Sequence, residues 1–277
     1  MNLFDQTTFE CSKVVTTRYS TSFTMGIRTL SGEYHNSIYA IYGFVRYADE
    51  IVDTFHDRDK AALLRRFKDD THRAIDERIS LNPILHAFQL VVNNYKIPLR
   101  FVDAFLHSME MDLKKVDYTP QSYREYIYGS AEVVGLMCLK VFCDGDDSLY
   151  QSLEAPACRL GSAFQKVNFL RDMNSDFNER GRVYFPGVQY DRFGERDKQL
   201  IEEDIQADFD AAREGIARLP VKARLGVQLA YEYYLRLFQK IRTSPVSGVL
   251  SQRIRIPDHR KWMILASAYL RYRLQII

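Results

Sequence analysis

The sequence predicts an all-α fold organised as a single domain. Apolar residues recur mostly at helical spacing, and runs that alternate in the manner of a β-strand are nearly absent. Most prolines precede a segment of helical periodicity, as expected when proline occupies the first turn of a helix; they are Pro83, Pro98, Pro120, Pro156, Pro220 and Pro257. Because residues 1–277 contain no internal repeat, low-complexity linker or change of composition, we predict one domain.

The predicted helices follow one another along the whole chain. A first helix is expected over residues 5–18, and a break at 20–22 leads to the next over 32–55, followed by 60–79, 83–95 and 100–114. Residues 120–128 and 131–143 form either two helices or one kinked helix, because Gly129 and Ser130 interrupt them. A long helix over 155–177 precedes an irregular segment over 180–190, and helices resume over 198–218, 221–242 and 258–276.

Composition and charge are ordinary for a globular protein, with 46% hydrophobic residues and a net charge of +2. No concentrated basic stretch is present, which argues against nucleic acid as a partner. The N-terminus lacks the pattern of a secretory signal, and no apolar run approaches the ~18 residues that cross a bilayer. We therefore expect a cytoplasmic protein whose four cysteines, Cys11, Cys138, Cys143 and Cys158, are buried reduced thiols.

One polar stripe lies within the long helix predicted over 155–177. Gln165, Asn168, Asp172 and Asp176 succeed one another at intervals of three and four residues, which aligns them on one helix face. Arg171 sits beside this stripe, and the other face of the helix is apolar. The stripe therefore combines two carboxylates, an amide and a guanidinium.

A second stripe repeats this chemistry much earlier in the chain. Tyr42, Arg46, Asp49 and Asp53 follow one another at intervals of four, three and four residues. They form another helix face with two aspartates one turn apart and an arginine one turn before them. Since sites in helical bundles are built from side chains on facing helices, tertiary packing can bring the two stripes together.

Two such stripes favour a site for Mg²⁺ and a diphosphate. Carboxylate and amide oxygens are ligands that Mg²⁺ accepts, and the ion typically uses one or two carboxylates together with phosphate oxygens. Each acidic pair alone is more simply a solvated helix face, but the coincidence of two argues otherwise. We predict Mg²⁺, with Mn²⁺ as an alternative, held by Asp49, Asp53, Asn168, Asp172 and Asp176, and a diphosphate clamped by Arg46, Arg171 and Arg253.

The same segments carry a family resemblance. YADEIVD and NFLRDMNSD, followed by RGRVYFP, resemble the two aspartate-rich motifs of the squalene and phytoene synthase family, the head-to-head prenyl transferases. STSF at 20–23, YGSAEVVG at 128–135 and RIRIPDHRKW near the C-terminus appear in the expected order and at the expected separations, so the resemblance covers nearly the whole chain. It implies an isoprenoid synthase-type helical bundle around a central cavity.

The resemblance also implies further site residues. Ser20 and Ser22 would face a diphosphate, and Gln165, Tyr128 and Tyr234 would line the mouth where two substrates meet, although any single tyrosine is more often a core residue. Aliphatic and aromatic walls would exclude water from a carbocation; the candidates, each equally a core residue, are Phe23, Tyr42, Phe44, Val133, Val134, Leu136, Met137, Phe164 and Phe169. Glu50 and Ser175 depart from the usual motifs, where many members carry aspartate and glutamate.

The implied reaction joins two prenyl diphosphates. We favour a bacterial phytoene synthase that condenses two geranylgeranyl diphosphates, with Asp49, Asp53, Asp172, Asp176 and Arg171 as the catalytic residues. A bacterial squalene or dehydrosqualene synthase that uses farnesyl diphosphate is the alternative, and a non-catalytic partner subunit is an alternative of another class. NADPH is not expected, since no glycine-rich dinucleotide fingerprint is present, although reductases of this family do not rely on it.

The C-terminal segment raises the question of membrane contact. KWMILASAYLRYRLQII combines apolar residues with Lys261, Arg271 and Arg273, and its aromatic residues are of the type that settle at a lipid–water boundary. A terminal helix packed on the domain explains the pattern slightly better than a helix at the membrane interface. A C40 product must leave into lipid, so we expect peripheral contact with the inner face of the membrane. Whether the protein is a monomer or a homodimer is left open.

Overall fold

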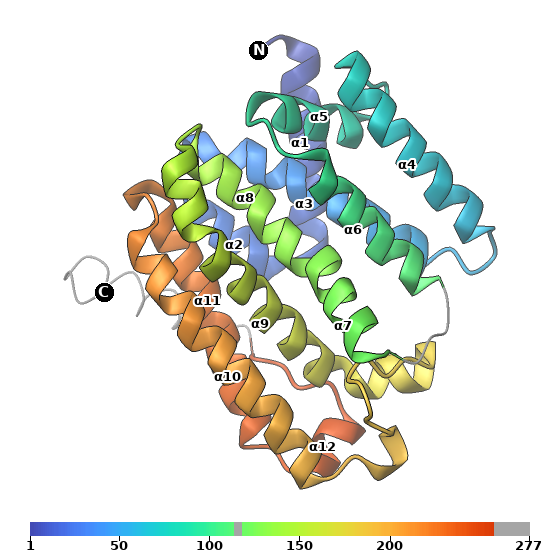
Figure 1. The fold of residues 1–277 in the computed structure, drawn as a ribbon. Coiled ribbons are helices and arrows are strands. Elements are labelled where there is room, and N and C mark those ends of the chain that lie inside the picture. Colours follow the sequence, from blue (N-terminus) through green and yellow to red (C-terminus); the bar gives the residue numbers. More distant parts are fainter. Residues whose placement is uncertain (114–117, 258–277) are drawn as a thin grey trace.

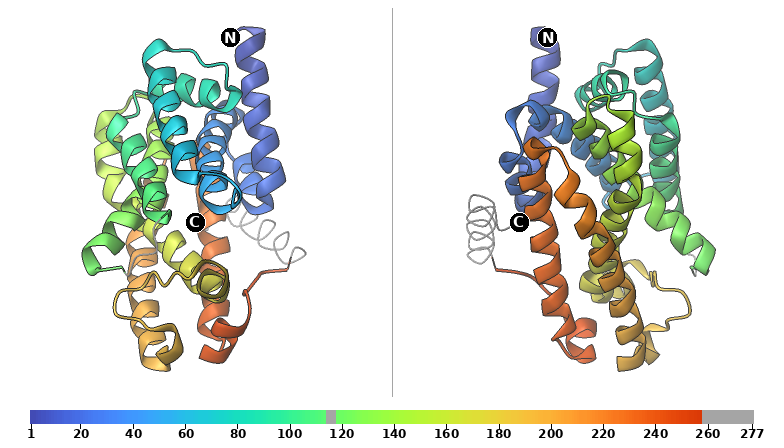
Figure 2. Two further views of the ribbon diagram at one scale, coloured as in Figure 1. Left: turned by 90° about the vertical axis from the view of Figure 1, so that its right-hand side faces the viewer. Right: turned by 60° about the vertical axis from the view of Figure 1, so that its left-hand side comes forward.

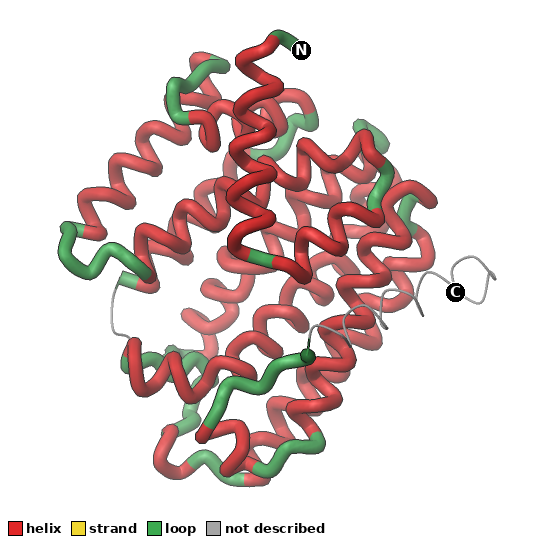
Figure 3. Tube along the Cα trace, turned by 180° about the vertical axis from the view of Figure 1, so that it is seen from behind, coloured by secondary structure: helices red, strands yellow, loops and turns green. Residues whose placement is uncertain are grey.

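The protein is built from helices throughout the part of the chain that the structure describes. A computed structural model describes residues 1–113 and 118–257. These residues form α-helices, one π-helical turn and one 3₁₀ turn, and no strand (Figure 3). The all-α prediction is confirmed. The helix predicted over 258–276, and the membrane contact assigned to it, lie outside the described residues.

The helices are joined by short connections (Figure 1). Their bounds are α1 Leu3–Tyr19, α2 Thr21–Thr29, α3 Gly32–Asp53, α4 Lys60–Glu77, α5 Pro83–Asn94, α6 Leu99–Asp112, α7 Pro120–Ile127, α8 Val133–Cys143, α9 Asp147–Arg180, α10 Glu195–Arg218, α11 Val221–Arg242 and α12 Val246–Ser251. The π-helical turn is Tyr128–Glu132, and the 3₁₀ turn is Tyr190–Arg192.

Capping residues fix where several helices begin. The Asn82 side chain accepts hydrogen bonds from the first turn of α5, which starts at Pro83. Thr119 forms a capping box ahead of Pro120 in α7, and Asp146 accepts from the Leu149 amide at the start of α9. Each cap satisfies amide groups that have no partner within the helix, and proline at the first position lacks such an amide.

The bundle is assembled around α3 and α9. Figures 1 and 2 show α10 and α11 on one side and α4, α5 and α6 on the other. Phe44 of α3 is fully buried, and its ring stacks on Phe88 of α5 with centroids 3.9 Å apart. Phe67 of α4 and Phe105 of α6 lie 5.6 and 5.3 Å from the same ring. Phe44 therefore belongs to the core and not to a substrate wall.

The structure differs from the sequence prediction at three helices, of which α12, Val246–Ser251, is a short one where no helix was predicted. Helix α2 occupies residues for which only a break was predicted; it begins directly after α1 because Ser20 both ends α1 and caps α2. Helix α9 begins at Asp147, eight residues before the predicted start, so Pro156 lies inside the helix and not in its first turn. The Pro156 ring packs against Gly215 of α10. A Cβ added to Gly215 would lie 2.3 Å from the Pro156 Cβ.

Glycines allow four helix pairs to approach closely. A Cβ on Gly129 would lie 2.4 Å from the Ala104 carbonyl oxygen of α6, and a Cβ on Gly226 of α11 would lie 2.4 Å from Leu30. A Cβ on Gly161 of α9 would meet the Ala131 carbonyl oxygen at 2.8 Å. We call these close approaches, together with that between Gly215 and Pro156, the glycine seams. They allow the helices to pack tightly around the interior of the bundle.

The helical stretch Pro120–Cys143 runs through the π-helical turn without a break. By length and composition it is the one stretch among the described residues that could cross a membrane, and 56% of its apolar window is buried inside the protein. A core helix of a bundle has the same properties. The four thiols are free; Cys143 is buried, and the others are half-buried.

Candidate active site

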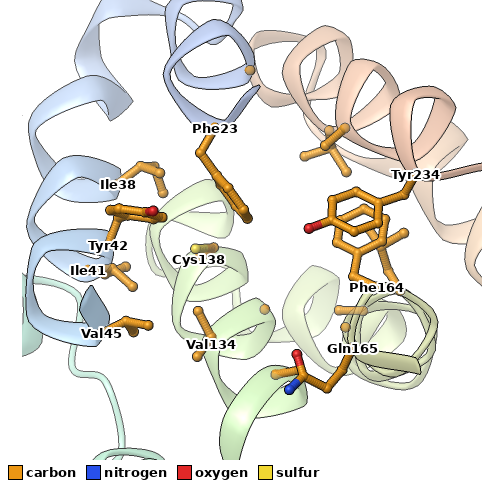
Figure 4. A pocket seen from close by; sticks show the side chains of 18 of the residues that line it. Phe23, Ile38, Ile41, Tyr42, Val45, Val134, Cys138, Phe164, Gln165 and Tyr234 are labelled. Carbon is orange, nitrogen blue, oxygen red and sulfur yellow. The ribbon is translucent and has the colours of Figure 1, made fainter. Parts of the chain in front are cut away.

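A cavity of about 610 Å³ lies between α2, α3, α8, α9, α10 and α11 (Figure 4). Its deep walls are apolar: Ile38, Ile41 and Val45 of α3 face Val134 and Cys138 of α8. The ring of Phe164 stacks on Tyr234 at 4.0 Å on the opposite side. A long hydrocarbon chain fits such a surface.

The cavity gathers residues from both predicted stripes at its polar end. The predicted site residues that line it are Ser20, Ser22, Tyr42, Arg46, Asp49, Gln165, Asn168, Arg171, Tyr234 and Arg253. Asp53, Asp172 and Asp176 continue the two stripes just beyond this lining. Of the predicted wall residues, Phe23, Tyr42, Val134 and Phe164 line the cavity, while Phe44, Val133, Leu136, Met137 and Phe169 do not.

The first stripe lies on the last three turns of α3. Arg46 forms an ion pair with Glu50 and lies 4.0 Å from Asp49, and its guanidinium carbon stands 4.4 Å from the centre of the Tyr19 ring. The Nε of Arg46 is buried without a hydrogen-bond partner. Glu50, which stands where many family members have aspartate, therefore orients Arg46. The Nε group of Arg46 is left free to donate a hydrogen bond to a ligand.

Asp49 is the most electrostatically perturbed carboxylate of this stripe. Its pKa is raised to about 7, chiefly by burial; Arg46 opposes this rise, and the nearby Asp53, Asp112 and Glu50 contribute to it. The side chain is still 34% exposed, because it faces the cavity. Negative charge at this end of the cavity thus exceeds what the arginines neutralise, a condition that a divalent cation relieves.

The second stripe lies along α9. Asp172 accepts hydrogen bonds from Arg171 Nε at 3.0 Å and is paired with Arg253 Nε at 2.7 Å. One turn earlier, the side-chain oxygen of Asn168 is buried and has no hydrogen-bond partner. The ion pair with Asp172 raises the pKa of Arg171 despite its burial, whereas burial lowers the pKa of Arg253. Because a guanidinium stays protonated in proteins, both arginines are charged beside the cavity.

The site contains one further carboxylate, which sequence analysis missed. Asp112, the last residue of α6, accepts a hydrogen bond from the Tyr126 hydroxyl at 2.8 Å and forms an ion pair with Arg182 at 3.3 Å. Arg182 also lies 3.8 Å from Asp53. Burial raises the pKa of Asp112 to about 6, and Arg182 opposes that rise. A lone aspartate at a helix end carries no sequence signal of this role.

Tyr128 does not reach the cavity, contrary to the prediction. It starts the π-helical turn, is 37% exposed, and points away from the lining, which instead contains Tyr126. Residues two positions apart lie on nearly opposite faces of a helix, so only one of the two tyrosines can face the interior. The tyrosine of this segment that lines the cavity is therefore Tyr126.

The residues present fit a divalent cation that a diphosphate helps to hold. Among residues 1–113 and 118–257, no three His, Cys, Asp or Glu side chains are gathered closely enough to hold an ion by themselves. Mg²⁺ needs few carboxylates when phosphate oxygens complete its shell. The side-chain oxygen of Asn168 has no partner, and the pKa of Asp49 is raised. A bound cation would give the oxygen a partner and would stabilise the ionised form of Asp49.

Asp49→Asn should raise the melting temperature of the metal-free protein at pH 8. Since the pKa of Asp49 in the folded chain, about 7, exceeds its ordinary value of 3.8, the stability it contributes is present at low pH and lost as pH rises through 7. Asparagine has no carboxyl group to ionise, so the variant does not lose this stability as the pH rises. We expect a gain of roughly 2–4 °C at pH 8 in EDTA and a smaller one at pH 5. Equal gains at both pH values would contradict the assignment.

Comparisons with known proteins agree with this architecture. The sequence profile of the squalene/phytoene synthase family matches residues 16–260. Phytoene synthase of Arthrospira platensis is 26% identical, over 96% of this chain and 93% of that protein. A bifunctional lycopene cyclase/phytoene synthase of Pyrenophora tritici-repentis is 25% identical over 89% of this chain, which spans about half (48%) of that protein's length.

Solved structures share the fold. A dehydrosqualene synthase crystallised with a ligand superposes with a TM-score of 0.82 at 21% identity, covering 96% of this chain and 98% of the other. A squalene synthase from Alicyclobacillus acidocaldarius gives a TM-score of 0.77 at 22% identity, covering 87% and 95%. With a family profile that matches most of its length, this chain belongs to the squalene/phytoene synthase family.

Proposed function

We propose that the protein condenses two prenyl diphosphates head to head and releases diphosphate, and that the favoured substrate is geranylgeranyl diphosphate with phytoene as product. The observation that carries the proposal is a cavity that joins an apolar interior to a polar end containing residues of both aspartate stripes. The names of relatives such as the phytoene synthases of Arthrospira platensis and of Paracoccus support the C20 substrate.

The proposed reaction breaks an allylic carbon–oxygen bond first. One substrate loses diphosphate to leave an allylic cation, the double bond of the other attacks that cation, and loss of a proton closes the three-membered ring of a cyclopropylcarbinyl diphosphate. A second ionisation, rearrangement and loss of a proton give the hydrocarbon. When bound, Mg²⁺ supplies Lewis-acid charge that stabilises the departing diphosphate.

The residues of this chain have separate tasks in that scheme. Asp49 and Asn168 face the cavity with oxygens suited to a cation, while Arg171 and Arg253 carry guanidinium groups suited to diphosphate oxygens. The apolar walls keep water from the cation, and the Phe164–Tyr234 stack presents aromatic rings to it.

Product analysis tests the proposal. The purified protein, supplied with Mg²⁺, should convert geranylgeranyl diphosphate to phytoene at a rate that does not depend on NADPH. Faster conversion of farnesyl diphosphate would favour the alternative, a squalene or dehydrosqualene synthase, which the names of the structural neighbours suggest. No hydrocarbon from either substrate would favour a non-catalytic partner, which the presence of both aspartate stripes argues against.

We also propose reversible contact with membranes, because the C40 product is insoluble in water. Basic residues of the C-terminal segment, such as Lys261 and Arg271, would be attracted to anionic lipid. The protein should float with vesicles that contain anionic lipid at low salt and should dissociate as salt screens the attraction. Absence from the vesicle fraction at low salt would remove the proposal.

A further inference from the structure

Arg182 connects three separate parts of the site. It follows the end of α9, and its side chain is only 13% exposed. Its Nη1 lies 3.3 Å from the Asp112 carboxylate and 3.8 Å from that of Asp53, and Nη2 donates to the Asp112 backbone carbonyl at 2.5 Å. The Tyr184 hydroxyl accepts a further hydrogen bond at 3.4 Å.

Asp112 binds both Arg182 and a tyrosine of the cavity wall. Its side chain is 6% exposed, and it receives the Tyr126 hydroxyl on one oxygen and Arg182 near the other. Tyr126 lines the cavity, whereas Asp112 does not. The aspartate thus touches both a wall of the cavity and the arginine that approaches the first stripe, without belonging to the lining itself.

Arg182 interacts more strongly with Asp112 than with Asp53. Asp112 offers the shorter carboxylate distance and adds a backbone acceptor, so it takes the larger share of the guanidinium's interaction. If Asp112 lost its charge, Asp53 would be left as the carboxylate partner of Arg182. The guanidinium would then compete with a cation for Asp53.

We propose that Asp112 is a positioning residue that anchors Arg182 and so preserves the ability of Asp53 to bind the metal. The proposal rests on the proposed function, because it takes Asp53 as a ligand of Mg²⁺. It assigns a role in the site to a carboxylate that stands in neither aspartate stripe.

Calorimetry of metal binding tests this without turnover. Mg²⁺ is titrated into protein saturated with inorganic diphosphate, with the heat of Mg²⁺ binding to diphosphate alone subtracted. Asp112→Asn should weaken Mg²⁺ binding about tenfold or more, the scale expected for redirecting a charge-assisted hydrogen bond. Asp112→Asn combined with Arg182→Gln removes both charges, and affinity should return to within about threefold of the wild type, as for uncoupled neutral partners.

Two further variants separate positioning from other causes. Arg182→Lys keeps the charge but cannot reach the carboxylate and the backbone carbonyl together, so Mg²⁺ binding should weaken several-fold. Asp208→Asn is the matched control, because Asp208 is a buried aspartate paired with Arg159 and Lys166 away from the cavity; it should lower the melting temperature and leave Mg²⁺ affinity unchanged.

The outcomes are distinct. Unchanged affinity in Asp112→Asn, or a double variant no better than the single one, would overturn the positioning role while the proposed site stands. Wild-type affinity in Arg182→Lys would show that only net charge matters and would overturn it too. If the wild-type protein binds no Mg²⁺ in the presence of diphosphate, the proposed metal site itself fails, and the inference fails with it.

Discussion

Asp172→Asn should lower kcat by roughly 10³-fold or more, the scale at which groups that stabilise developing charge contribute to catalysis. Asp172 accepts from Arg171 at 3.0 Å and pairs with Arg253 at 2.7 Å, and it is one of the proposed metal ligands. Asparagine has nearly the same shape but no charge, so it loses both ion pairs and the attraction for the cation. The melting temperature should stay close to that of the wild type.

The matched control is Asp57→Asn. Asp57 lies four residues beyond Asp53, its side chain is 76% exposed, and it pairs only with the neighbouring Arg58 among the contacts of the described residues. It removes the same charge from an exposed turn after α3 that does not line the cavity, and kcat should stay within about twofold, as for exposed ion pairs. A fully active Asp172→Asn protein would show that the stripe on α9 is a solvated face.

Removal of divalent cations should stop turnover completely. Burial raises the pKa values of Asp49 and Asp112, the nearby Asp53 adds to both shifts, and a diphosphate would add further negative charge. We therefore expect the site to need a cation before it accepts substrate. Initial rates measured in excess EDTA should fall to background and should recover when Mg²⁺ or Mn²⁺ is added beyond the chelator.

Circular dichroism in EDTA supplies the control for that experiment. The helical signal should persist, because the helices are held by the aromatic core around Phe44 and not by the metal. Unimpaired turnover in excess EDTA by a protein freed of metal would exclude the proposed mechanism.

Local sequence patterns predicted most of the fold because most helices bury one continuous apolar face. They failed where a helix depends on its neighbours. Helix α2 has nine residues, begins directly after α1, and is stabilised by Ser20 as its cap. Pro156 would ordinarily end or start a helix. Here α9 continues through it, and Gly215 of α10 leaves room for its ring.

The two stripes could be read from the sequence because i,i+4 spacing is a local property. Asp112 and Arg182 could not, since each is a single charged residue whose role appears only when α6, the end of α3 and the segment after α9 meet. The resemblance assigned Tyr128 to the cavity and did not name Tyr126. The two residues lie on nearly opposite faces of the helix, and it is Tyr126 that lines the cavity.

The glycine seams restrict how the cavity could change its size during evolution. A methyl group on Gly215 or Gly226 would collide with Pro156 or Leu30, which line the cavity beside them, and would push the helices apart. Substitution of side chains that already project into the cavity, such as Val134 and Cys138, can instead make the cavity narrower or deeper (Figure 4). A lineage that adapts to shorter or longer substrates would therefore vary at α8 and keep its glycines.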